Sequence, residues 1–183
     1  AGGAGLTDSV VLLQKSYRFG DASGIGQVSR AVRGGDTEAF SLLRSGSFPD
    51  ASWVPFDEPG GDARALGERI VQGSAGFLRA RTPGEAFDAL GRFRVLCALR
   101  QGPLGVGAVN HLAERALSNA GLIRPPRTGS LWYRGRPVMV AVNDYALGLF
   151  NGDVGIALPD PAQGGELRVF FPAPRGGLRS LPP

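Results

Sequence analysis

Residues 135–158 read GRPVMVAVNDYALGLFNGDVGIAL, and this segment carries the clearest structural signal in the C-terminal part of the chain. It contains two apolar runs, the first from Val138 to Val142 and the second after Asp153. Between them lies a polar loop that ends in Asn151-Gly152-Asp153. Asn-Gly favours the positive φ values that a tight hairpin turn requires. The stretch therefore predicts one β-hairpin.

Strand-like sequence continues to the C-terminus. Composition changes at Arg124, where Arg-Pro-Pro-Arg-Thr-Gly-Ser begins a predicted linker over residues 124–131. From Trp132 onward, short apolar runs alternate with Gly, Pro and Asn turns, and no helical period is present. Residues 167–171 and 178–181 are further strand candidates. We predict a β-barrel of five or fewer strands in this part.

The N-terminal part predicts two short helices. Ser23 is a suitable cap for the first, and Gly34-Gly35 is a suitable end. Asp36 or Thr37 begins the second, and residues 48–59 form a loop or a short strand. The first helix carries four residues on one face, which are Ile25, Val28, Ser29 and Val32. The second is expected to turn Phe40, Leu42 and Leu43 inward.

The middle of the chain alternates helices with one strand. Apolar spacing over residues 62–79 predicts an amphipathic helix, and Thr82-Pro83-Gly84-Glu85 predicts the start of the next one. Residues 94–99 are apolar on both faces, as in the central strands of parallel sheets. Residues 106–120 then carry one apolar stripe, closed by Gly121. Strand, loop and helix in this order form half of a β-α-β unit, so the fold class is α/β.

Composition excludes several classes of site. Among 183 residues, Cys97 is the only cysteine and His111 the only histidine, which rules out an internal disulfide and a His/Cys metal cluster. We expect Cys97 to be buried and inert, and we expect no structural metal. No apolar run approaches the roughly 20 residues that a membrane span needs. The net charge of +4 makes a polyanionic partner plausible.

No phosphate-binding loop of the Walker type is present. The only lysine, Lys15, follows Gln14 rather than a glycine, and position 9 is Ser9. Asp57-Glu58 is flanked by prolines and reads as a surface loop. We therefore expect no ATP hydrolysis by this chain alone. The Gly-rich stretches 20–26 and 102–107 each precede a helix, so each either presents free N–H groups to a phosphate or is an ordinary helix-start turn.

Trp132 and Tyr133 lie among Arg124, Arg127, Arg134 and Arg136. Aromatic rings with arginines suit single-stranded nucleic acid, through base stacking and phosphate neutralisation. The alternative is that both rings are core residues of the first barrel strand and the arginines form a solvated face. The sequence leaves both interpretations open.

Several motifs together resemble one protein family. They are Leu-Gln-Lys-Ser-Tyr-Arg-Phe at 13–19, Ser-Gly-Ile-Gly and Ala-Val-x-x-Gly-Asp within 23–36, Val-Leu-Cys-Ala-Leu-Arg-Gln-Gly-Pro-x-Gly-Val at 95–106, and Trp-Tyr-x-Gly-Arg-Pro-Val-Met at 132–139. These segments, with residues 135–158, resemble the RecD family, the helicase α subunits of bacterial exodeoxyribonuclease V in superfamily 1. The resemblance implies a fragment of the parent. Residues 1–123 would be part of the second RecA-like motor domain, and residues 132–183 a truncated SH3-like barrel insertion.

The resemblance also implies a function for the parent protein. It would be an ATP-dependent 5′→3′ DNA helicase that acts in recombinational double-strand break repair. Its cofactor would be ATP with Mg²⁺, its partners RecB- and RecC-type subunits and single-stranded DNA, and its location cytoplasmic. The segment would contribute motif IV to the ATP cleft and part of the DNA track, with no cofactor bound tightly. The alternative function is a non-enzymatic module that binds nucleic acid or protein through an SH3-like barrel.

Site residues follow from the same resemblance. Arg18 would reach the γ-phosphate as an arginine finger, Tyr17 would stack near the adenine, and Gln14 is a weaker nucleotide contact. The residues implied for the DNA track are Arg100, Gly105, Val106, Asn110 and Asn143. For Asn143 and Asn151, a role within the hairpin itself is the competing interpretation. A shortage of His, Cys and Lys argues against a complete small enzyme of another type.

Overall fold

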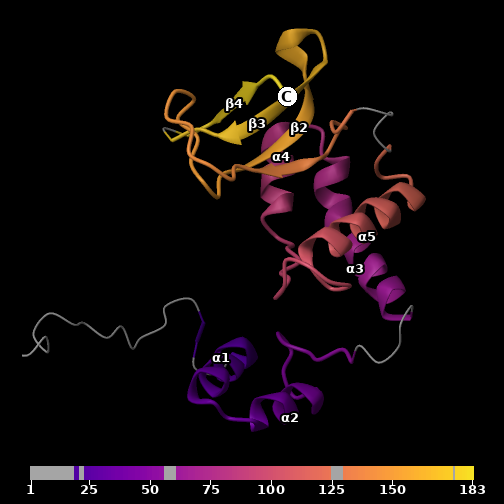
Figure 1. Cartoon of the computed structure of the whole chain (residues 1–183), viewed down its shortest axis with the longest axis vertical. Coiled ribbons are helices and arrows are strands. Elements are labelled where there is room, and N and C mark those ends of the chain that lie inside the picture. The colour runs from indigo at the N-terminus through magenta and orange to yellow at the C-terminus, as the bar shows by residue number, and fades with distance from the viewer. Residues whose placement is uncertain (1–18, 21–22, 56–60, 125–129, 175) are drawn as a thin grey trace, which may run out of the picture. The chain divides into compact units, whose positions relative to one another are not determined.

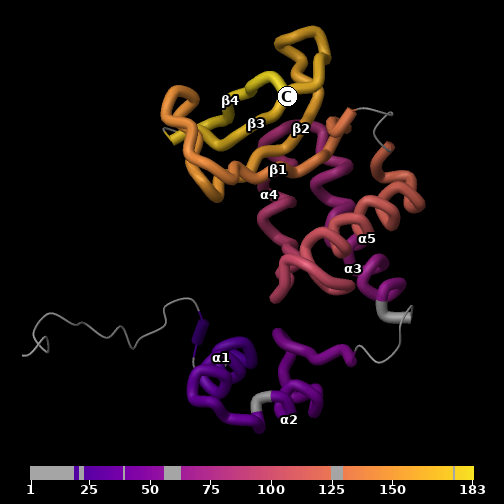
Figure 2. Tube along the Cα trace, viewed as in Figure 1, coloured from indigo at the N-terminus to yellow at the C-terminus, as the bar shows by residue number. Residues whose placement is uncertain are grey.

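The computed structural model describes residues 19–20, 23–55, 61–124, 130–174 and 176–183. The chain forms two compact units, residues 1–57 and residues 58–183. Figure 1 labels the elements of each unit, and Figure 2 traces the chain through them. Within the described ranges, no helix is long and apolar enough to cross a bilayer.

The first unit contains α1 (Gly24–Gly34) and α2 (Glu38–Arg44). The Ser23 hydroxyl accepts a hydrogen bond from the amide of Gly26, which satisfies one of the free donors at the start of α1. Gly35 ends the helix with φ of 71°, a left-handed conformation that favours glycine. The predicted cap and end of the first helix are both confirmed.

Two of the three inward positions predicted for α2 are wrong, while Leu43 is partly buried. The side chains of Phe40 and Leu42 are 51% and 38% exposed. Phe40 instead packs edge-on against Trp53, with ring centroids 5.5 Å apart. Two helices of 11 and 7 residues present too little apolar surface to bury these side chains within the unit.

Three helices begin the second unit: α3 (Gly61–Arg79), α4 (Pro83–Leu90) and α5 (Val106–Asn119). The predicted start of α4 is confirmed: the Thr82 hydroxyl accepts from the amide of Glu85, as expected of a cap. The Glu85 carboxylate accepts from the amide of Arg81, the residue before the cap. The predicted helices over 62–79 and 106–120 are confirmed as well, and Gly121 follows α5 with φ of 69°.

The second unit continues into one antiparallel sheet, in the order β1 (Pro137–Met139), β2 (Val154–Asp160), β3 (Glu166–Pro172) and β4 (Leu178–Leu181). A short 3₁₀ turn, η2 (Pro161–Gln163), joins β2 to β3. The predicted hairpin is confirmed, because β1 and β2 pair with Met139 opposite Val154. The sheet is open, with β1 and β4 at its edges, and it is not a closed barrel. Helices together with a sheet agree with the coarse α/β class.

The sheet buries both of its faces. One face carries Ile156, which is 0% exposed, into a core shared with Ile70, Leu78 and Leu90 of the helices. Figure 1 shows the sheet lying across one end of α3 and α4. The other face forms a second cluster around Val169 and Phe171, covered in part by the loop between β1 and β2.

Trp132 and Tyr133 pack on opposite faces of the sheet. Trp132 belongs to the second cluster and Tyr133 to the first. Arg134 donates to the carbonyl of Ala80, and Arg136 to the carbonyl of Leu131. Packing of both rings therefore agrees with the core interpretation in part, since the rings are partly buried but precede β1 rather than lie in a strand. Both arginines donate to main-chain carbonyls rather than form a purely solvated face.

The strand predicted over residues 94–99 does not form. This stretch pairs with no strand among the described residues, and several of its apolar side chains are exposed, with Leu96 91% and Leu99 60% exposed. An apolar run forms a central strand only where neighbouring strands supply its backbone hydrogen bonds, and no described residues do so here. Cys97, at its centre, is only partly buried.

Candidate functional site

The turn that leads into α5 folds tightly against the start of the helix. The amide of Gly105 donates to the carbonyl of Gly102 at 3.0 Å, and the amide of Val106 donates to that of Leu99 at 3.0 Å. Gly102 adopts φ of 94°, which only glycine takes without strain. These bonds hold residues 99–105 as a closed loop in front of the helix.

The first turn of α5 leaves backbone donors free. Gly105 occupies the cap position but has no side chain to accept from the helix, and the first turn contains no acidic residue. The amides of Gly107 and Ala108 donate to none of the residues that the structure describes. Free N–H groups and the positive end of the helix dipole together favour an anion at this position.

Gly105 is required by the close approach of the turn. A Cβ atom at this position would lie 2.6 Å from the carbonyl carbon and oxygen of Gln101 and 2.8 Å from the carbonyl carbon of Arg100. These are backbone atoms, so a larger residue has to displace the turn itself. The glycine therefore fixes Arg100 beside the start of the helix.

We expect Gly105→Ala to lower the free energy of unfolding by about 1–3 kcal/mol, as overpacked sites do. The matched control is Gly107→Ala on the same helix, where an added Cβ meets nothing within 4 Å. Because alanine favours helices, this control gains up to about 1 kcal/mol. Urea unfolding of both variants measures the difference, and equal stabilities would contradict the close packing of the turn.

The structure brings together four of the five residues predicted for the DNA track. Arg100 and Gly105 lie in the turn, while Val106 and Asn110 lie one helical turn apart on α5. Arg100 and Asn110 are exposed. Asn143 is separate from this group, since it lies in the loop between β1 and β2.

Asn143 takes part in the hydrogen bonding of its own loop. Its side-chain carbonyl accepts from the amide of Asn151 at 2.8 Å, and its amide group donates to the hydroxyl of Tyr145 at 3.2 Å. Arg179 supports the loop from β4 by donating to the carbonyls of Leu147 and Gly148. These contacts support the hairpin role that competed with DNA contact for this residue.

The residues predicted for the nucleotide, Arg18, Tyr17 and Gln14, lie outside the described residues. So does Asp57-Glu58.

The Gly-rich stretch before α1 is already occupied by a carboxylate. Asp50 accepts from the Ser23 hydroxyl at 2.8 Å and from the amides of Gly24 at 3.0 Å and Ile25 at 3.5 Å. Asp50 fills the position where a phosphate would bind, so the ordinary helix-start interpretation holds for residues 20–26. Sequence spacing gave no signal for this contact, because the carboxylate comes from 26 residues further along the chain.

The same contacts make the start of α1 sensitive to acid. The hydrogen bond from Ser23, followed by those from Gly24 and Ile25, holds the pKa of Asp50 below its ordinary 3.8, against the opposing effect of burial. A lowered pKa contributes stability above pH 3.8 that is lost as the pH falls through the folded-state pKa. We expect the NMR amide signals of Gly24 and Ile25 to stay constant near neutral pH and to shift only in acid. Asp50→Asn should abolish this step, and its persistence would contradict the assignment.

A second polar cluster joins α5 to the start of the sheet. Tyr133 donates to Glu114 at 3.2 Å, and Arg136 lies 3.6 Å from the same carboxylate oxygen. The Arg136 guanidinium also lies over the Tyr133 ring, 5.3 Å from its centroid. Burial, followed by the charge of Glu114, raises the pKa of Tyr133 to about 12, so the phenol stays protonated. The sequence showed Tyr133 and Arg136 but gave no sign of their partner on α5.

Comparisons with known proteins find similar sequences among RecD subunits. No protein-family model matches this sequence. The chain is 36% identical over 155 residues to the RecBCD enzyme subunit RecD of Mycolicibacterium smegmatis, covering 83% of this chain and 26% of that protein. It is 36% identical to RecD of Mycobacterium tuberculosis, again over 83% of the chain and 26% of the relative. With RecD of Buchnera aphidicola it shares 25% identity over 97% of the chain and 30% of the relative.

The chain thus spans between a quarter and a third of the length of these relatives. The aligned part includes most of this sequence, as the resemblance of its separate motifs predicted. Over most of its length, the chain is a homologue of one segment of the RecD subunit of RecBCD enzymes.

Proposed function

We propose that the chain is a segment of an ATP-dependent 5′→3′ DNA helicase subunit that acts in recombinational double-strand break repair. In this proposal it works beside RecB- and RecC-type subunits in the cytoplasm. The observation that supports DNA binding is the structure at the start of α5. There, the turn that contains Arg100 lies directly before the free amides of Gly107 and Ala108. The similarity to RecD supports the class of enzyme.

The segment would occupy the second motor domain of this helicase. Residues 1–123 would be the RecA-like part, residues 124–131 a linker, and residues 132–183 an SH3-like insertion. The extended stretch 94–99 supports this arrangement, because its exposed apolar side chains on both faces suit a central strand flanked by further strands. The position of the turn also fits, since α/β sheets bind ligands just beyond the carboxyl ends of their strands.

On the ATP side, Arg18 would supply a positive charge to the γ-phosphate, Tyr17 would stack on the adenine, and Gln14 would contact the nucleotide. ATP would carry Mg²⁺, which neutralises charge on the phosphates. Walker residues would come from other parts of the helicase. The isolated chain should therefore show no ATP turnover with or without DNA, and turnover above background would contradict the proposal.

DNA binding at the start of α5 is tested by fluorescence anisotropy with a labelled oligo(dT) over a range of salt concentrations. Removing one phosphate contact in Arg100→Ala should weaken binding and lower the salt slope by about 0.7, the value per phosphate for single strands. The matched control is Arg115→Ala, an exposed arginine further along the same helix. If both variants lose affinity equally, the basic charge of the chain rather than this site binds the DNA.

A further inference from the structure

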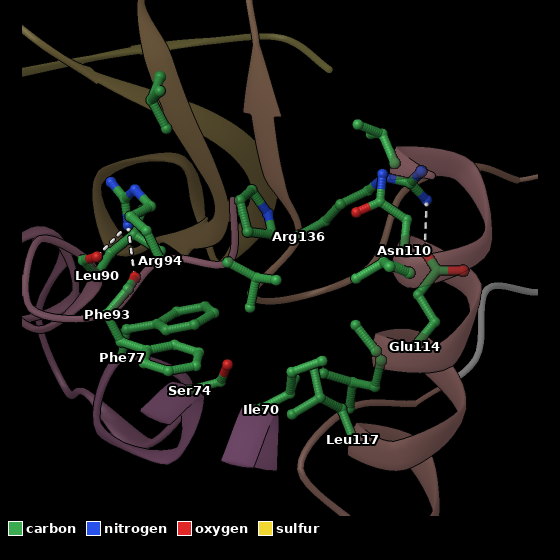
Figure 3. A pocket seen from close by; sticks show the side chains of 18 of the residues that line it. Ile70, Ser74, Phe77, Leu90, Phe93, Arg94, Asn110, Glu114, Leu117 and Arg136 are labelled. Atoms are coloured by element: carbon green, nitrogen blue, oxygen red, sulfur yellow. Dashed lines mark hydrogen bonds and ion pairs between the residues drawn. The ribbon is translucent and has the colours of Figure 1, made fainter. Parts of the chain in front are cut away.

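A cavity of about 360 Å³ lies within the second unit, beneath the start of α5. Its walls come from α3, α5, the stretch 93–97 and residues 133–137 (Figure 3). Much of the lining is apolar, and Figure 3 shows the rings of Phe77 and Phe93 close together on one side. A cavity of this size falls within the range of small-ligand sites.

A buried hydroxyl faces this apolar space. Ser74 is only 7% exposed, and Figure 3 shows its oxygen on the cavity side of α3. The hydroxyl makes no hydrogen bond to any residue in the described ranges. A buried hydroxyl without a partner is unfavourable, so it indicates that a polar atom of a ligand belongs at this place.

The rim adds both donors and acceptors. Asn110 contributes an amide, Glu114 a carboxylate and Arg136 a guanidinium, and Arg94 lies on the opposite side (Figure 3). Glu114 and Arg136 partly neutralise each other at 3.6 Å. A rim of mixed polarity above aromatic walls suits a flat, uncharged ring with polar edges. It suits a phosphate less well, because the walls are aromatic.

Two residues connect the cavity to the proposed DNA contact. Val106 and Asn110 line the cavity and also belong to the first two turns of α5, where the free amides lie. A nucleic-acid backbone at the start of α5 would therefore lie next to two residues that line the cavity.

We propose that this cavity receives one nucleobase of a single strand whose backbone lies at the start of α5. This site rests on the proposed function and extends it from the backbone to the base. The base edge would hydrogen-bond to Ser74 and Asn110, while one of its faces contacts Phe77 and Phe93. Such contacts tolerate different bases, because every base has a π face.

The test compares an oligo(dT) with a strand of equal length in which every base is replaced by an abasic tetrahydrofuran site. Both carry the same phosphates, so the start of α5 alone would bind them equally. We expect the unmodified chain to bind oligo(dT) roughly tenfold more tightly, as expected when one base stacks on aromatic rings. Ala113→Leu, which fills the cavity from α5, should reduce binding of oligo(dT) to the abasic level. Ala65→Leu, at an exposed position of α3, should leave both affinities unchanged.

The outcomes separate this proposal from the function on which it rests. Equal binding of both strands by the unmodified chain overturns the base site and leaves the backbone contact in place. Equal binding is also the expected result if the cavity instead binds an apolar side chain of a partner protein. A preference for oligo(dT) that survives Ala113→Leu overturns the base site as well. No binding of either strand at low salt overturns both proposals. Ser74→Ala, which changes volume little, should lower the preference for oligo(dT) without changing abasic binding.

Discussion

Replacing Ile156 with alanine is expected to lower the free energy of unfolding of the second unit by about 2–5 kcal/mol. Ile156 is 0% exposed and lies in β2, where it packs against helix residues and pairs across the sheet with Pro137 and Phe170. Removing its side chain leaves a void at the contact between helices and sheet. Thermal unfolding should show a midpoint lowered by about 10 °C.

The matched control is Leu96→Ala, which also shortens an aliphatic side chain. Leu96 is 91% exposed, so its loss should change stability by no more than about 0.5 kcal/mol. If the two variants unfold at the same temperature, the sheet and the helices do not share the core described above.

Replacing Arg18 with alanine in a full-length helicase that contains this segment is expected to lower kcat by about 10³-fold or more. An arginine finger stabilises charge that develops on the transferred phosphoryl group, so its removal acts on turnover more than on nucleotide binding. Steady-state ATPase assays with single-stranded DNA would measure kcat and KM separately.

Two further variants make this prediction specific. Arg18→Lys should restore little activity, because an ammonium lacks the planar fork of a guanidinium. Arg33→Ala, at an exposed position near the end of α1, should leave kcat unchanged. An Arg18→Ala enzyme with normal turnover would refute the arginine-finger role and, with it, the motif IV assignment.

Local signals in the sequence predicted most of the secondary structure. Ser23, Thr82 and Gly121 mark helix ends through hydrogen bonds and backbone conformations that act within a few residues. Asn151-Gly152 likewise marks the hairpin, and Gly152 has φ of 96°. Such features depend on neighbours in the chain, so they are readable without knowledge of the tertiary structure.

Features that depend on distant partners were not readable in this way. The stretch 94–99 has the composition of a central strand, but composition does not supply the strands beside it. Phe40 has helical spacing, but its burial depends on a surface that α1 and α2 do not provide. Asp50 reaches the start of α1 from a distant loop, which no local pattern indicates.

The candidate site also combines features that the sequence indicates locally with features that depend on distant parts of the chain. Four of its predicted residues lie close together in the sequence, and the structure places them around the start of α5: Arg100, Gly105, Val106 and Asn110. The cavity next to them combines Ser74, Glu114 and Arg136 from three separate parts of the chain. Its existence follows from packing between helices and sheet, which the sequence pattern does not describe.

The central claim is that single-stranded DNA contacts this chain at the start of α5. Titration of the isotope-labelled chain with oligo(dT), followed through backbone amide NMR signals, tests it residue by residue. We predict the largest shifts at Gly107 and Ala108, whose amides are free, with further shifts at Arg100. Shifts confined to residues 130–136, with the start of α5 unchanged, would contradict the claim and favour a separate binding module.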